Sequence, residues 1–234
     1  MEIKGFVDMS LVDWDGRASA VLFLPRCDFR CPYCQNAALV LHPENIETIP
    51  YEKIRAYLKE YRWGLGGVVI TGGEPTLHRD LPDLCMRLKE LGFPVKLDTN
   101  GTRPEMLEKL LDENLIDYVA MDIKAPLTVE KYSRASGVDA STFLGDVRKS
   151  IALLMSSEVP YEFRTTVVPT LHTPQDVQEI CMEIRGCMKY VLQNFRPGET
   201  LNPEFNKLPP FTRGELQEFL RAARRVIPNV SIRP

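Results

Sequence analysis

Three cysteines, Cys27, Cys31 and Cys34, lie within eight residues of one another in this chain of 234 residues. Their C-x3-C-x2-C spacing directly follows a short apolar run, residues 21–25, so one loop could wrap all three thiols around a compact metal site. Closely spaced cysteines are typical ligands of iron–sulfur clusters, which are held by thiolates. Three ligands on a cluster of four irons would leave one iron open to another group. A structural zinc site completed by a distant Cys or His is the alternative.

The remaining cysteines lie apart from this loop. Cys85, Cys181 and Cys187 occur within segments of helical pattern, where free cysteines are usually small buried residues. The spacing from Cys181 to Cys187 is not that of a ferredoxin-type cluster. We therefore expect one metal site and no second cluster.

Length and charge narrow the classes of function. A chain of 26.7 kDa fits one domain spanning residues 1–234. The formal net charge of −3 and the pI near 5.7 argue against a nucleic-acid binder, which would carry a basic face. There is no long apolar run and no leader-like pattern, so we expect no membrane partner and a cytoplasmic protein with reduced thiols.

Apolar strand-like runs alternate with helical patterns along most of the chain. After a first strand or hairpin closed at Asp15-Gly16, the expected strands are residues 19–24, 67–71, 94–97, 117–121, 161–169 and 189–195. Strands that alternate with helices indicate βαβ units and a parallel sheet. We therefore predict an α/β fold, a partial (β/α)6 TIM-like barrel with mostly parallel strands, and a doubly wound open sheet as the alternative. The core would cover about residues 18–195, followed by a C-terminal loop and helix over about 196–234.

Polar and reactive residues follow the expected strands. They are the three cysteines, Glu74, the run Asp98-Thr99-Asn100, the pair Asp122 and Lys124, and the pair Gln193 and Asn194. The carboxyl ends of parallel strands meet at one edge of a sheet, where the active sites of such folds lie. We expect these groups to share one mouth. The proline-rich stretch 196–211 is either a lid over that mouth or, as we favour, a surface crossing.

Two of these motifs together resemble the radical S-adenosylmethionine (SAM) superfamily. The first is the cysteine loop, with Tyr33 before its last cysteine, and the second is Gly72-Gly73-Glu74-Pro75 after the next strand. A zinc site would not require the second motif. Nearly the whole chain resembles the glycyl-radical-enzyme activating enzymes, whose further motifs match residues 98–101, residues 122–124 and Arg164 with residues 167–169. Residues 12–16 and the short length most resemble activating proteins of anaerobic ribonucleoside-triphosphate reductase.

This resemblance implies a specific chemistry. Cys27, Cys31 and Cys34 would hold a [4Fe–4S] cluster, and S-adenosyl-L-methionine would chelate the fourth iron. The reduced cluster would cleave SAM, and the resulting radical would remove a hydrogen atom from a glycine of a partner, a glycyl radical enzyme such as the anaerobic ribonucleotide reductase. An electron donor such as flavodoxin or ferredoxin would be needed. The cofactors carry the hard chemistry, so the protein's part is positioning and exclusion of water and oxygen.

The resemblance also implies contacts to SAM. Gly72 and Gly73 would let backbone approach its amino end, and Glu74 would face its ammonium group. Tyr33 would contact the adenine. The alternatives from the residues alone are an ordinary turn after a strand, an acidic residue at a helix start and a loop anchor.

Asp122, Lys124 and Arg164 suit the ribose hydroxyls and carboxylate of SAM, and a structural ion-pair network is the alternative. Asp98 and Thr99 could instead join Asp122 around a monovalent cation, as in related activases.

Two features depart from the pattern of the family. Gln35-Asn36 follows the last cysteine, where many relatives have His-Asn. The three histidines, His42, His78 and His172, are expected at the surface or in loops without a ligand role.

Two other functions stay open: a radical SAM enzyme acting on a small molecule, and an iron–sulfur electron carrier. The motif at Gly72 disfavours the carrier.

Overall fold

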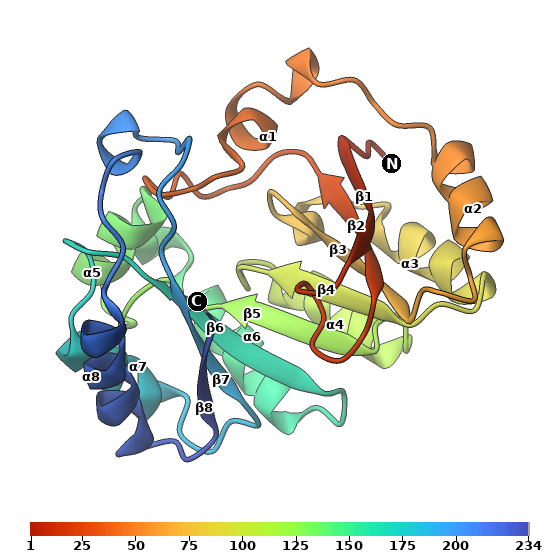
Figure 1. Cartoon of the computed structure of the whole chain (residues 1–234). Coiled ribbons are helices and arrows are strands. Elements are labelled where there is room, and N and C mark those ends of the chain that lie inside the picture. The colour runs from red at the N-terminus through yellow and green to blue at the C-terminus, as the bar shows by residue number, and fades with distance from the viewer. Residues whose placement is uncertain (234) are drawn as a thin grey trace. The chain divides into compact units, whose positions relative to one another are not determined.

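A computed structural model describes residues 1–233 and contains eight strands in one sheet, arranged in chain order with β1 and β8 at the edges (Figure 1). β1 is antiparallel to β2, while β2, β3 and β4 are parallel, as are β6, β7 and β8. The predicted α/β class, an open partial barrel with mostly parallel strands, is confirmed. The strands are β1 Gly5–Ser10, β2 Ser19–Leu24, β3 Gly67–Gly72, β4 Val95–Thr99, β5 Tyr118–Asp122, β6 Tyr161–Val167, β7 Tyr190–Asn194 and β8 Val230–Arg233.

Helices connect most of these strands. They are α1 Ala37–Leu41, α2 Tyr51–Glu60, α3 Leu81–Glu90, α4 Pro104–Asp112, α5 Val129–Ser136, α6 Leu144–Ser156, α7 Pro174–Glu183 and α8 Arg213–Arg224. Short 3-10 turns are η1 Pro43–Asn45, η2 Pro75–Leu77, η3 Ala140–Thr142 and η4 Pro203–Phe205. The strands expected from the sequence are present, whereas β8, α1 and α5 were not predicted.

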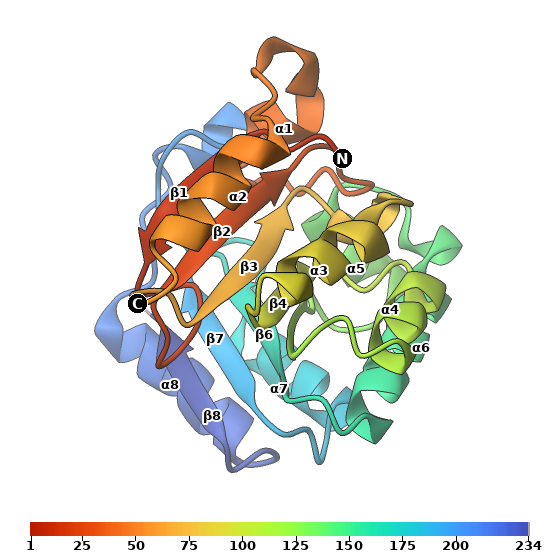
Figure 2. The ribbon, with the colours of Figure 1, turned by 90° about the vertical axis from the view of Figure 1, so that its right-hand side faces the viewer.

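The chain divides into two compact units. Unit 1 comprises residues 1–28, 38–99 and 105–119. In unit 1, α2 and α3 lie side by side over one face of the strands (Figure 2). α2 buries Ile54 and Leu58, which are one helical turn apart. The other face buries Trp14, Val21 and Val69. Coverage of both faces explains why β2 is an apolar run instead of an alternating one.

Unit 2 comprises residues 29–37, 100–104 and 120 onward. Here α7 and α8 pack on each other beside β7 and β8 (Figure 2). Both helices begin with a capping box, Thr173 with Asp176 and Thr212 with Glu215, in which side chains satisfy the first backbone N–H groups.

Within residues 1–233, none of the helices combines the length and the apolar character needed to cross a lipid bilayer.

Candidate active site

The end of β3 in unit 1 is shaped by Gly72 and Gly73. Gly72 has φ +116°, and a Cβ there would lie 2.4 Å from the carbonyl oxygen of Leu24. A Cβ on Gly73 would lie only 1.8 Å from the carbonyl oxygen of Arg26. The Gly73 N–H donates to the Leu24 carbonyl at 2.9 Å. The glycines therefore let the end of β3 pack closely against the segment after β2. From the sequence we had explained these glycines only by the approach of a ligand to the backbone.

Glu74 joins the ends of β3 and β4. Its carboxylate is buried, with the residue 1% exposed. Oε1 accepts hydrogen bonds from the Thr76 backbone N–H at 3.0 Å, from the Thr76 hydroxyl, and from the Thr99 hydroxyl at 2.7 Å. The hydrogen bond from the Thr76 backbone N–H makes Glu74 the N-cap of η2. Its role toward a ligand ammonium group stays a prediction.

Asp98 lies beside a buried ammonium group that sequence reasoning missed. Lys96 Nζ is 3.2 Å from Asp98 Oδ1, and Lys96 is 1% exposed. Its Nζ also donates to the Asp13 carbonyl and lies 5.9 Å from the centre of the Tyr118 ring. The position of this lysine between apolar residues of a strand was the sequence signal that it is buried. A monovalent cation at Asp98 would have to share the carboxylate with this ammonium, and that site stays a prediction.

In unit 2 the structure brings together Asp122, Lys124 and Arg164, which we name the charged set. Asp122 Oδ1 accepts from Arg164 Nε at 2.8 Å, and Oδ2 accepts from Lys124 Nζ at 3.0 Å. Burial raises the pKa of Asp122, but the two cations outweigh it and lower the pKa to about 2. Burial opposes the charge of Lys124, yet Asp122 holds the pKa of Lys124 well above its usual value. All three groups are therefore charged at neutral pH.

Two of the clustered cysteines and Tyr33 lie in the same unit as the charged set. Burial raises the pKa of the Cys31 thiol to about 11, although the charge of Lys124 opposes this. Burial also raises the pKa of Cys34. Tyr33 is 7% exposed, and among residues 1–233 its hydroxyl oxygen has no hydrogen-bond partner. Lys124 thus acts electrostatically on both Cys31 and Tyr33.

These donors fit the implied cofactors. Soft thiolate ligands suit iron–sulfur clusters, and metal binding displaces the thiol protons that burial otherwise retains. The unpartnered Tyr33 hydroxyl and the nearby ammonium of Lys124 suit a polar ligand. Cys27 belongs to unit 1, where its Sγ is 3.9 Å from Asp28 Oδ1. Within the described chain, no three Cys, His, Asp or Glu side chains converge as for a single metal ion. A four-iron cluster is larger than one ion and separates its ligands further.

A segment far along the chain binds the cysteine loop. We name residues 196–206 the strap. The Leu201 N–H donates to the Cys34 carbonyl at 3.0 Å, and the Asn202 N–H donates to the Pro32 carbonyl at 2.9 Å. Gln35 Nε2 donates to the Arg196 carbonyl at 3.0 Å. Within unit 2 the strap therefore binds the cysteine loop. From the sequence we had favoured a connection that only crosses the surface.

The three histidines differ in environment. His42 is exposed, and a nitrogen of His78 lies 2.8 Å from the Pro25 carbonyl. His172 lies in the loop between β6 and α7, as expected, but it is buried, with 4% of the residue exposed. It contacts the backbone of Lys124 and Val168. The signal in the sequence was its place between the expected strand 161–169 and Thr173, which caps α7.

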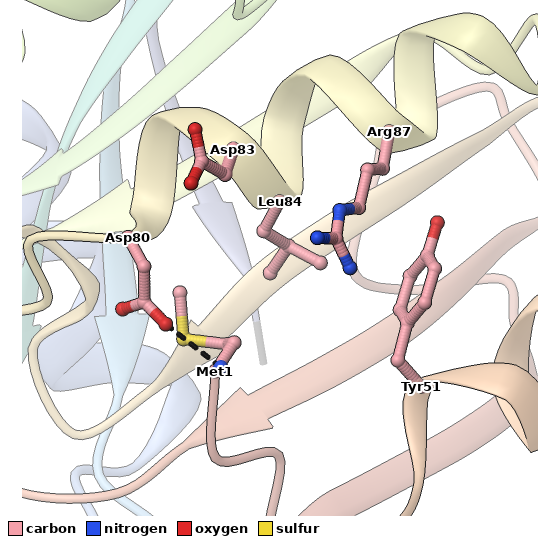
Figure 3. Close-up of a pocket in the computed structure, with 6 residues that line it drawn as sticks. All are labelled: Met1, Tyr51, Asp80, Asp83, Leu84 and Arg87. Carbon is pink, nitrogen blue, oxygen red and sulfur yellow. Dashed lines mark ion pairs between the residues drawn. The ribbon is translucent and has the colours of Figure 1, made fainter.

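A pocket in unit 1 is lined by residues other than the predicted ones (Figure 3). Its volume is about 90 Å³, and its lining includes Tyr51, Asp83, Leu84 and Arg87. The Met1 amino group and Asp80 Oδ2, both in its lining, form an ion pair of 2.7 Å (Figure 3). None of the predicted site residues lines it, and we assign it no catalytic role.

Comparison with known proteins identifies relatives over most of the chain. A family model described as "Radical SAM superfamily" matches residues 21–184. A Methanocaldococcus jannaschii protein named "Putative glycyl-radical enzyme activating enzyme" is 37% identical over 99% of this chain and 95% of its own length. The 7-carboxy-7-deazaguanine synthase of Thermococcus kodakarensis is 25% identical over 91% of this chain and 83% of that protein.

Solved structures show the same fold. Streptococcus suis SuiB bound to its precursor peptide SuiA matches 92% of this chain with a TM-score of 0.67 at 18% identity. This chain spans 48% of that structure, about half its length.

Proposed function

Because the chain belongs to the radical SAM superfamily, we propose that it binds a [4Fe–4S] cluster and S-adenosylmethionine and activates a glycyl radical enzyme. Cys27, Cys31 and Cys34 would supply the cluster thiolates. When bound, these cofactors supply one-electron chemistry that removes a hydrogen atom from the substrate. Thiolate ligands need a reducing compartment, so we place the protein in the cytoplasm.

The observation that carries this proposal is the electrostatic arrangement in unit 2. Lys124 is an ammonium group held by Asp122 at 3.0 Å and acting on Cys31 and Tyr33. It would attract the carboxylate of SAM, and the charged set as a whole would bind carboxylate and ribose hydroxyls. The Tyr33 hydroxyl would find in the ligand the partner that residues 1–233 do not provide.

Groups of unit 1 would supply the remaining contacts. We propose that the backbone at Gly72 and Gly73 and the carboxylate of Glu74 bind the amino end of SAM, and that Asp98 lies nearby. The hydrogen bonds from Thr76 and Thr99 fix the orientation of the Glu74 carboxylate before any ligand arrives.

The glycyl radical partner is proposed from the similarity to the M. jannaschii activating enzyme, which extends over 95% of that relative. We propose the anaerobic ribonucleotide reductase as the partner and a flavodoxin or ferredoxin as the electron donor. A small-molecule substrate is the second candidate, and the similarity to a 7-carboxy-7-deazaguanine synthase supports it.

One anaerobic experiment separates these candidates. The reconstituted, reduced protein is mixed with SAM and the candidate reductase, and electron paramagnetic resonance is used to detect a glycyl doublet. A parallel series replaces the reductase with small molecules, including purine precursors. A glycyl signal that requires SAM and reductant supports the activase. Turnover of a small molecule with no glycyl signal would support the second candidate, and absence of any SAM cleavage would contradict both.

A further inference from the structure

His172 ties together the ends of two neighbouring strands. Its Nδ1 lies 3.0 Å from the backbone nitrogen of Val168, the residue after β6. Its Nε2 lies 2.7 Å from the carbonyl oxygen of Lys124, two residues after β5. The ring is 4% exposed, so water cannot readily replace either contact.

The two contacts determine the tautomer. The Val168 N–H is a donor, so Nδ1 must accept. The Lys124 carbonyl can only accept, so Nε2 must carry the proton and donate. His172 is therefore a neutral imidazole with its proton on Nε2. Burial lowers the pKa of His172, which keeps this neutral form at physiological pH.

This ring holds one of the two polar backbone groups of Lys124, and Tyr132 holds the other. The Lys124 N–H lies 3.4 Å from the Tyr132 hydroxyl, and the Lys124 carbonyl accepts from His172. The side chain of Lys124 then reaches Asp122, 3.0 Å from Nζ. Loss of the His172 contact would free the Lys124 carbonyl group and with it the direction of the lysine side chain.

We propose that His172 is a positioning residue for the cofactor site, which fixes the Lys124 backbone and so keeps the Lys124 ammonium directed at its ligand. The inference rests on the proposed function for the identity of that ligand, the carboxylate of SAM. His172 itself touches neither cofactor in this role.

Two substitutions test the hydrogen-bonding role. His172→Gln offers a carbonyl that can accept from the Val168 N–H and an amide that can donate to the Lys124 carbonyl. His172→Leu fills the space but leaves both buried backbone groups unpaired. We expect the dissociation constant for SAM, measured by calorimetry on the cluster-loaded protein, to stay within about threefold for Gln and to rise at least about tenfold for Leu.

A matched control separates positioning from general destabilisation. Tyr161 begins β6, and its hydroxyl accepts from the Met188 N–H at 3.1 Å. Tyr161 is seven positions before Val168, which is about 23 Å in an extended strand. Tyr161→Phe removes one partner of a similar partly buried hydrogen bond. We expect a lower melting temperature and an unchanged affinity for SAM, whereas His172→Leu should change both.

The outcomes are distinct. A folded His172→Leu variant with the affinity of the wild type overturns the inference. If His172→Leu does not fold, His172→Gln decides, because a tenfold loss there also overturns it. If the wild type binds no SAM, the proposed function fails, and ¹⁵N NMR of the histidine rings of the full chain still tests the geometry. A His172 ring protonated on Nε2 supports the inference, and one protonated on Nδ1 overturns it.

Discussion

Replacing Asp122 by Asn is the sharpest test of the charged set. Asp122 accepts from both Arg164 and Lys124, at 2.8 and 3.0 Å. An amide keeps the shape of the side chain but loses the negative charge and one of the two acceptor atoms. An ion pair at the surface would contribute only about 0–1 kcal/mol to stability, so such a variant would melt normally if the pair were exposed. The burial of Arg164, 8% exposed, changes this expectation.

The magnitude follows from the pKa. The pKa of Asp122 is lowered from an ordinary value of 3.8 to about 2. This shift corresponds to roughly 2–3 kcal/mol of folding free energy. Its side chain is 27% exposed, so solvent screens this value only in part. We expect Asp122→Asn to lose about 2–3 kcal/mol at pH 7, equivalent to a melting temperature lower by roughly 4–12 °C.

The same shift sets a pH dependence. Because the folded-state pKa is depressed, the stabilisation is fully present above the unfolded-state pKa of about 4. It is lost as the pH falls through the folded-state value of about 2. Below pH 2 the wild type and Asp122→Asn should therefore converge in stability.

Urea unfolding of both proteins, followed by circular dichroism between pH 7 and pH 2, measures these differences. Asp146→Asn is the control, because Asp146 pairs with Lys149 at 2.8 Å on an exposed face of α6 and should change stability by at most about 1 kcal/mol. Equal stability of Asp122→Asn and wild type at pH 7 would refute the reasoning. So would a difference that persists unchanged at pH 2.

Three further predictions test separate parts of the molecule. Alanine at any one of the clustered cysteines should abolish the iron content of the reconstituted protein, whereas full iron content should remain in the controls, Cys85→Ala, Cys181→Ala and Cys187→Ala. Gly73→Ala should lose about 1–3 kcal/mol in urea unfolding, because its Cβ would lie 1.8 Å from the Arg26 carbonyl oxygen. Gly145→Ala is the control, since a Cβ added there would meet no other residue within 4 Å and the variant should keep or raise stability. Asn206→Ala removes the acceptor of the Thr200 N–H and hydroxyl in the strap, at 2.9 and 2.8 Å. It should speed loss of the cluster to a chelator about tenfold relative to Asn229→Ala, and an unchanged rate would show that the strap does not protect the cluster.

The sequence by itself determined the class of fold and the order of its elements. The apolar runs at residues 19–24 and 67–71 became β2 and β3 because strands covered on both faces need continuous apolar residues. The capping residues Thr173 and Thr212 began helices because their side chains satisfy backbone N–H groups locally. The edge strand β8 escaped prediction, because its four residues are a strand only through pairing with β7.

The candidate site divides in the same way. The cysteine spacing and the residues Asp122, Lys124 and Arg164 were visible as types and positions, since each follows or lies within a recognisable strand. The shifts in their pKa values were not visible, because a pKa depends on burial and on neighbours distant in the chain, as between Asp122 and Arg164. The buried Lys96, the strap on the cysteine loop and the tautomer of His172 likewise depend on contacts between segments far apart in sequence. A local pattern cannot specify such contacts, so only the tertiary structure decided them.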